Sequence, residues 1–399
     1  MHLISALAFH SITDLAKQYD PIMRLKLGEV DTIVVSSGEL SCEMLKQHDP
    51  CYADRPNSIG IKPPKRLLLR LHPQRRAAAD GAPVNIRDAI FSMMSSVTCR
   101  AAFGKVSKDK DTLIKILRDG IQMVGGFEIA YFFLSSFVIN TFSWTKIRLL
   151  MMRHKLDVIL DELIRQHQRN LAKIDSGSED GERGRKGNDD FGNEDIVDVL
   201  LRLQETGELQ FPIRKEDIKA VVYDMFCAGT ETSSTAMDWA MAELMRNPRV
   251  IAKVQAEVRQ GSTEDARSGS NPATSITRRA RDRRVRNPSK REGSRDPQYW
   301  TNPDSFEPER FEECSKEFVG ADFDYLPFGA GKRMCPGITF AMASVELVLA
   351  QLLYHFDWKL PNGAQPESMD MIENPGVTAS RRDSLTASRP NLKHQIFYL

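Results

Sequence analysis

The sequence predicts a single domain, residues 1–399, that is mainly α with a minor β-sheet. Three long segments carry apolar residues at helical spacing, at 86–102, 216–245 and 338–354. One segment, 22–35, alternates and then becomes β-branched, which is typical of a β-hairpin. Because 41% of the residues are apolar, a chain of this length can bury one large core.

Two further helical segments connect these elements. A short helix is expected at 39–47, directly after the hairpin, and residues 111–173 are mostly helical in pattern. Within the second segment, residues 129–144 are uncharged and rich in phenylalanine. They fall short of the roughly 20 residues that a spanning helix needs. Two interpretations remain for them: burial around a pocket, or contact with a membrane surface.

Three stretches interrupt the pattern. Residues 57–83 show no clear period, 176–195 are almost entirely small, polar or charged, and 260–295 lose nearly all apolar residues. The second is expected to be a flexible surface loop, since it has too little apolar surface to offset ordering entropy. The first and third read like translated noncoding or out-of-frame sequence. A mispredicted or decayed gene product is therefore one hypothesis for this chain.

Composition excludes several classes of partner and site. The 55 basic and 54 acidic residues give a net charge of +1, so no global charge attracts nucleic acid or an anionic membrane. The basic run 278–295 has eight arginines and one lysine but no aromatic residue to stack bases, so no nucleic-acid partner is expected. The cysteines form no close pair, which indicates reduced thiols rather than a disulfide or zinc scaffold. They are Cys42, Cys51, Cys99, Cys227, Cys314 and Cys335.

A glycine-rich loop directly ahead of the last predicted helix carries the strongest chemical signal, because it contains Cys335. Near a helix N-terminus, free backbone N–H groups and the positive end of the helix dipole stabilise an anion. The thiolate anion is the form of cysteine that binds metals. Glycines in the loop would let the backbone approach a flat cofactor closely, and Arg333 is placed to neutralise a carboxylate.

This loop resembles the haem-binding signature of the cytochrome P-450 family, Phe-x-x-Gly-x-Arg-x-Cys-x-Gly. All five fixed positions match: Phe328, Gly331, Arg333, Cys335 and Gly337. The resemblance implies the cytochrome P-450 fold, with Cys335 as the axial ligand of the iron of haem b. It also implies that Arg333 contacts a haem propionate and that Phe328 packs beside the ligand loop. A thiolate ligand favours O–O cleavage. The implied activity is insertion of one oxygen atom from O2 into a small lipophilic, terpenoid-like substrate.

A second motif lies in the helix expected at 216–245, where Ala228-Gly-Thr-Glu-Thr-Ser matches the family's oxygen-activating pattern. By this resemblance Ala228 lines the cofactor and Gly229 leaves room for dioxygen. The Thr232 hydroxyl and the Glu231 carboxylate would deliver the protons that O–O scission consumes. A threonine on a buried helix otherwise bonds the carbonyl one turn back. The functional interpretation therefore depends on the cysteine loop downstream.

Other family features are matched in part or missing. Residues 306–311 resemble the segment whose arginine, here Arg310, joins a buried ion-pair network in the family. The Glu-x-x-Arg partner has no counterpart, because Glu264/Arg267 and Glu292/Arg295 lie in surroundings that cannot bury an ion pair. The early tryptophan that grips the haem propionates is missing too. The sequence thus predicts the family's fold with missing segments.

These absences leave two hypotheses for function. In the first, the chain is an active monooxygenase that receives electrons from NADPH through a flavoprotein reductase. In the second, it is a catalytically inactive, truncated or mispredicted member that retains haem poorly. Plant microsomal members sit on the endoplasmic reticulum membrane. The N-terminus here shows neither a charged region followed by a long apolar run nor an anchor, so the cytoplasm is the alternative location.

Overall fold

The computed structural model describes residues 8–19, 21–27, 30–52, 84–104, 110–124, 144–175, 194–267, 302, 305–311, 320–323, 325–374 and 378–387. The predicted irregular stretch 57–83 lies outside the described residues, as do 176–193 and 268–295 of the other two stretches. The phenylalanine-rich segment is described only at its last residue, Trp144.

The described chain is mainly helical, which confirms the predicted fold class. Its α-helices are α2 (Ala8–Gln18), α3 (Gly38–Cys42), α4 (Asp49–Tyr52), α5 (Ile86–Phe103), α6 (Lys110–Val124), α9 (Trp144–Asp175), α11 (Ile196–Thr206), α12 (Lys215–Arg246), α13 (Pro248–Arg267) and α15 (Ile338–His355). Its strands are β1 (Ile22–Leu27), β2 (Val30–Val35), β3 (Val84–Asn85) and β4 (Thr386–Ala387).

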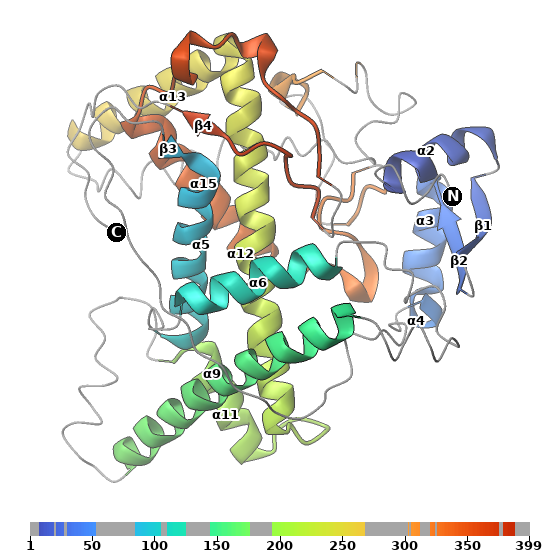
Figure 1. Ribbon diagram of the computed structural model, residues 1–399, viewed down its shortest axis with the longest axis vertical. Coiled ribbons are helices and arrows are strands. Elements are labelled where there is room, and N and C mark those ends of the chain that lie inside the picture. The colour runs from blue at the N-terminus through green and yellow to red at the C-terminus, as the bar shows by residue number, and fades with distance from the viewer. Residues whose placement is uncertain are drawn as a thin grey trace.

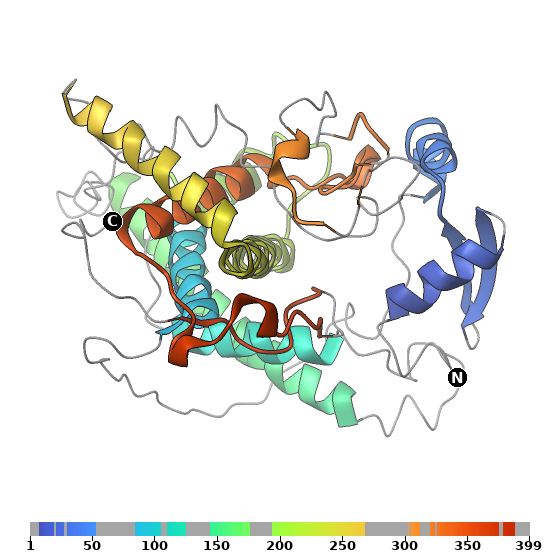
Figure 2. The same cartoon turned by 90° about the horizontal axis from the view of Figure 1, so that it is seen from above.

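Helix α12 runs through the middle of the molecule, with α5 and α15 beside it (Figure 1). Figure 2 shows α12 end-on, with the other helices arranged around it. The helix begins where the Asp217 carboxylate accepts a hydrogen bond from the backbone N–H of Arg214, at 2.9 Å. It ends at Asn247, before the proline that starts α13. The predicted long helix at 216–245 is therefore confirmed.

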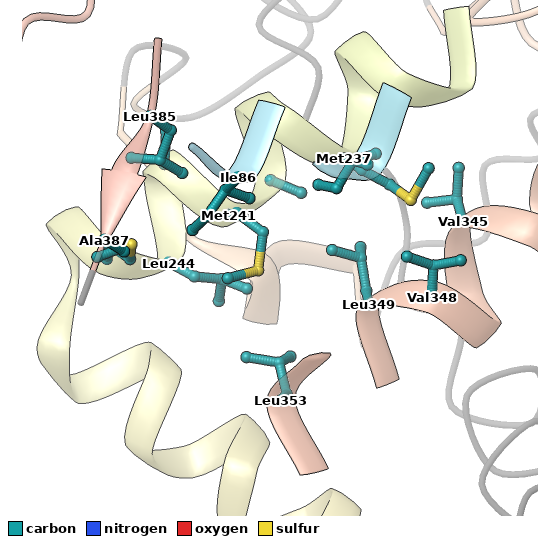
Figure 3. Packing of buried hydrophobic residues seen from close by; sticks show 14 of the residues in the cluster. Ile86, Met237, Met241, Leu244, Val345, Val348, Leu349, Leu353, Leu385 and Ala387 are labelled. Atoms are coloured by element: carbon teal, nitrogen blue, oxygen red, sulfur yellow. The ribbon is translucent and has the colours of Figure 1, made fainter. Parts of the chain in front are cut away.

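The main core joins the C-terminal half of α12 to α15 and to the start of α5 (Figure 3). Met237 and Met241 of α12 are fully buried between them. Residues of the short strand β4 close one side of this cluster. The other labelled members are Ile86, Leu244, Val345, Val348, Leu349, Leu353, Leu385 and Ala387. The same cluster contains side chains of α5, α12 and α15, so it holds α15 in a fixed position relative to α12.

Helix α15 is also the one described helix that is long and apolar enough to cross a membrane, with a mean hydropathy of 1.4. A core helix of a soluble protein can have the same length and composition. Here Val345, Leu349 and Leu353 of α15 are buried in the main core. One third of the helix, 33%, is buried in this way, so its packing accounts for part of its apolar composition.

Two small antiparallel sheets complete the fold. The hairpin β1–β2 pairs Leu25 with Thr32, as expected for a hairpin at 22–35. It lies with α2, α3 and α4 away from the helical core (Figure 1). The second sheet pairs β3 with β4 and ties the start of α5 to the C-terminal part of the chain. The sequence gives no sign of this sheet, because strands of two residues have no period to detect.

Two of the predicted irregular stretches are shorter in the structure. Helix α13 continues to Arg267, so the first eight residues of the stretch 260–295 are helical rather than irregular. At the end of 176–195, Asp195 is not part of a flexible loop. Its carboxylate caps α11 by accepting from the backbone N–H of Asp198 at 3.0 Å. Asp195 is a charged residue like its neighbours in the loop, so composition alone does not show that the loop ends and α11 begins there.

Asp195 also forms a buried pair with His167 of α9. The His167 Nε2 and the Asp195 Oδ2 are 2.8 Å apart, and both side chains are less than 10% exposed. The other ring nitrogen, Nδ1, lies 2.9 Å from the carbonyl oxygen of Leu163. Both nitrogens therefore face acceptors, which favours the imidazolium form. Burial opposes the charge, but the hydrogen bond with Asp195 and its negative charge outweigh it and raise the pKa of His167.

This pair should make stability depend on pH. Because the folded state binds the proton more tightly, the pair stabilises the fold below the ordinary histidine pKa of 6.5, and this contribution is lost as pH rises through the raised value. We expect the free energy of unfolding in urea to fall as the pH rises above about 6. His167→Gln should flatten this slope and cost about 1–3 kcal/mol at the acidic end. The exposed His48→Gln serves as control, and a slope unchanged in His167→Gln would contradict the assignment.

Candidate haem-thiolate site

The loop that carries Cys335 is closed at its base by a backbone hydrogen bond. The N–H of Cys335 donates to the carbonyl of Phe328 at 2.9 Å. Between them, Gly331–Arg333 form a 3₁₀ turn, and the Met334 N–H donates to the Gly331 carbonyl at 3.1 Å. Gly329 and Gly331 have φ values of +71° and +68°, a region that residues with a side chain rarely adopt. The sharp turn predicted from the glycines is therefore present at these two positions.

Cys335 is partly buried two residues before Gly337, the residue that precedes α15. The predicted position at a helix N-terminus is thus confirmed. Gly337 has an ordinary φ of −96°, so the turn itself does not require glycine there. A Cβ at this position would lie 3.9 Å from the Cys335 Sγ. Its absence leaves space beside the sulfur, which suits a thiol that must be reached by a bulky planar group.

The tip of the loop approaches protein rather than open space. A Cβ added at Gly331 would lie 2.7 Å from the backbone oxygen of Leu45 and 2.9 Å from the Asp49 Oδ1. The close approach expected of Gly331 is therefore made to the segment around α4. Arg333 and Lys332 are exposed on the same turn.

The oxygen-activating motif lies on α12 and contacts the helix that follows Cys335. A Cβ added at Gly229 would lie 3.2 Å from Cε1 of Phe340, on α15, and 3.3 Å from Cγ2 of Thr98, on α5. Three helices thus pack closely at Gly229, where an added side chain would require its neighbours to shift. This packing brings the two sequence motifs together, because Phe340 is only five residues beyond Cys335.

One face of α12 is exposed although the helix is central. Val221 is 37% and Met225 is 42% exposed, and Ala228 and Thr232 follow on the same side at helical spacing. The Thr232 hydroxyl donates to the Ala228 carbonyl at 2.6 Å, the bond that a helical threonine commonly makes. This exposed face, which also carries Asp224, presents apolar side chains and ends in a hydroxyl, and α12 packs at Gly229 on the helix that follows the cysteine loop. Such an arrangement fits a large planar apolar cofactor with a cysteine ligand.

Glu231 lies on a different side of α12, towards α5 and α6. Burial raises the pKa of its carboxyl group. The positive charges of Arg118 and Arg87 and a hydrogen bond with Thr235 partly offset that rise. Glu231 and Thr232 are therefore adjacent in sequence but differ in surroundings, since Glu231 is partly buried and Thr232 is exposed.

Arg310 does not meet a buried Glu-x-x-Arg pair within the described part of the chain. Its guanidinium donates to the backbone carbonyls of Asn302 and Ser305, at 2.8 and 2.9 Å. The carboxylate of Glu307 lies 3.7 Å away. Among the described residues, the contacts of Arg310 thus lie within its own segment, 302–310.

The sequence does not predict three residues that contact the site: Asp49, Thr98 and Phe340. Each is far in sequence from the residue that it contacts, and none belongs to a motif. Thr98 and Phe340 are recognisable only once α5 and α15 are placed against α12. Contacts of this kind leave no periodic or spacing signal in a single sequence.

The close fit at Gly229 leads to a test. Gly229→Ala places a methyl group against Thr98 and Phe340, and we expect a loss of about 1–3 kcal/mol in the free energy of unfolding, as for overpacked cores. Adding Thr98→Ala should recover part of this loss, so a double-mutant cycle in urea should show coupling. Gly120→Ala is the control, because Gly120 lies within helix α6 and an added Cβ would make only ordinary van der Waals contact, 3.4 Å from Cε of Met152. Additive effects at 229 and 98 would contradict the contact.

Comparison with known proteins agrees with this geometry. The cytochrome P-450 family model matches residues 64–275 and 292–385. Premnaspirodiene oxygenase of Hyoscyamus muticus is 37% identical over 457 residues, which cover 96% of this chain and 89% of that protein. The 5-epiaristolochene 1,3-dihydroxylase of Nicotiana tabacum is 36% identical over 458 residues, with the same two shares.

The same comparisons show where the chain departs from its relatives. An alignment of 457 residues is longer than the 399 residues of the chain, so the relative has positions that this chain lacks. The family match breaks at 276–291, inside the stretch 260–295 that loses its apolar residues, whereas it runs through residues 64–83. The chain belongs to the cytochrome P-450 family, as a member that lacks internal segments of its relatives.

Proposed function

We propose that this chain binds haem b through Cys335 and oxygenates a small, terpenoid-like substrate beside the exposed face of α12. Membership of the family gives the reaction class, a monooxygenase that uses haem b, O2 and electrons from NADPH through a flavoprotein reductase. The observation that carries the proposal is the folded cysteine loop, whose following helix packs on the oxygen-activating motif at Gly229.

The cysteine loop would hold the cofactor. Cys335 is the only thiol of the motif, and the bond from its N–H to the Phe328 carbonyl fixes the backbone from which the sulfur projects. Arg333, exposed on the same turn, would neutralise a propionate. When bound, haem supplies the iron at which dioxygen is reduced and split. The protein's part is to keep the thiolate in place and to deliver protons.

Glu231 and Thr232 would deliver those protons. A carboxyl group whose pKa is raised by burial holds its proton closer to neutral pH than an exposed one, which suits a group that alternately gives and takes protons. The Thr232 hydroxyl donates to the Ala228 carbonyl and can rotate to donate towards the exposed face. Gly229 and Ala228, with no side chain or a methyl group, would leave the space that dioxygen needs.

The exposed face of α12 indicates the chemical class of the substrate. Met225 and Val221 offer apolar contacts one and two turns before the motif, and Asp224 is an exposed charged residue between them. A lipophilic hydrocarbon is the ligand that such a surface favours. Two relatives are named as an oxygenase of premnaspirodiene and a dihydroxylase of 5-epiaristolochene, which supports the same class. We place this chemistry at the endoplasmic reticulum membrane, as in plant microsomal members.

A second candidate function is that of an inactive member with poor haem retention. Arg310 supports it, because this arginine bonds to backbone carbonyls and Glu307 instead of a helix-borne ion pair. The skipped positions in the alignments support it as well. The two candidates differ in one measurable property, the ability to keep a thiolate-ligated haem.

Replacement of the cysteine tests the ligand. The haem-loaded protein, reduced and exposed to carbon monoxide, should show the absorption band of a thiolate-ligated haem. Cys335→Ser should abolish this band because an alcohol does not replace the thiolate. Cys42→Ser, which changes another partly buried cysteine away from the loop, should keep it. A folded wild-type protein without the band would favour the inactive alternative.

Glu231→Gln separates catalysis from stability. Because burial disfavours the charged carboxylate, the neutral amide should leave the free energy of unfolding at pH 7 unchanged or slightly higher. Product formed per NADPH consumed should fall about tenfold or more, since proton delivery typically contributes 10²–10⁴-fold. The exposed Glu208→Gln is the matched control. Unchanged coupling between NADPH and product would remove Glu231 from the mechanism.

A further inference from the structure

We propose that Asp49 is a positioning residue, which holds the tip of the cysteine loop so that Cys335 is presented to the cofactor. This inference rests on the proposed function, because it concerns the same loop. Asp49 starts α4, more than 280 residues before the loop, and belongs to no motif that the sequence displays.

A buried carboxylate bonds directly to the loop. The Asp49 Oδ2 accepts a hydrogen bond from the backbone N–H of Lys332 at 2.7 Å. Asp49 is only 7% exposed whereas Lys332 is exposed, so the bond is partly buried and competition from water is reduced. A short bond from a backbone N–H to a carboxylate is about twice as strong as a bond between neutral groups. Lys332 sits in the 3₁₀ turn, three residues before Cys335.

The fit of Gly331 makes the contact specific. Its Cα lies so close to Leu45 and Asp49 that an added Cβ would come within 2.7 Å of the Leu45 oxygen. The backbone is also in the left-handed region, with φ of +68°. A side chain at this position would therefore force the loop tip away from the Asp49 carboxylate.

Two fixed points then determine where the sulfur lies. The base of the loop is fixed by the bond between Cys335 and Phe328, and the tip by Asp49. A further contact lies close by in sequence, because the Lys46 ammonium lies 5.0 Å from the ring centroid of Phe323, five residues before Phe328. With both ends held, the residues between Gly331 and Cys335 have little freedom to move the thiolate.

The test compares Asp49→Ala with Asp49→Asn, whose amide oxygen can still accept from Lys332. In the haem-free full chain, amide hydrogen exchange at Lys332 should speed up about tenfold or more in Asp49→Ala and change little in Asp49→Asn. Alkylation of the Cys335 thiol, followed by mass spectrometry, should speed up severalfold only in Asp49→Ala. Asp31→Asn, an exposed carboxylate of the neighbouring hairpin, is the control. Unchanged helical circular dichroism confirms that each variant is folded.

The haem-loaded protein gives the second readout. Asp49→Ala should lower the share of haem that shows the thiolate-ligated band, and Asp49→Asn should restore it. Faster exchange at Lys332 with unchanged Cys335 alkylation and an unchanged band would overturn the positioning role, as would unchanged exchange. If the wild-type protein shows no thiolate band at all, the proposed function fails, whereas the exchange and alkylation rates in the haem-free chain still decide the role of Asp49.

Discussion

Helix α12 is the element on which the rest of the structure depends. It passes through the molecule between α5 and α15, and the absence of a side chain at Gly229 lets Thr98 and Phe340 approach its backbone. Buried methionines then extend the contact towards its C-terminal end. Because α15 starts directly after the cysteine loop, the packing that stabilises the core also places the predicted iron ligand relative to the oxygen-activating motif.

The site combines a rigid part and an open part. The cysteine loop is held by backbone bonds at its base and by a buried carboxylate at its tip. One face of α12 is exposed, carries Val221 and Met225 together with Asp224, and ends in a hydroxyl. A cofactor that covers such a face would bury apolar surface, which is favourable. A held loop and an open face suit the chemistry of the family, since the cysteine that binds the iron must stay fixed while substrate and oxygen enter.

The chain departs from its relatives outside the cysteine motif, which would bind the iron. In the part of the chain that the structure describes, Arg310 bonds to backbone carbonyls, and the alignments contain positions that the relatives have and this chain lacks. The cysteine motif itself is intact in sequence, so the missing positions bear on the contacts around it. Haem retention is therefore the property in which the two candidate functions differ.

The sequence alone determined the fold class, the long helices, the hairpin and the two motifs, because period and fixed spacing are local properties of a chain. It also identified Cys335 and the motif that contains Gly229 and Thr232 as belonging together. It could not reveal the buried His167–Asp195 pair, the sheet between β3 and β4, or Asp49 at the loop tip. Only the tertiary structure decided these, because each joins segments that are distant in sequence, and their contacts depend on how the helices pack rather than on any local pattern.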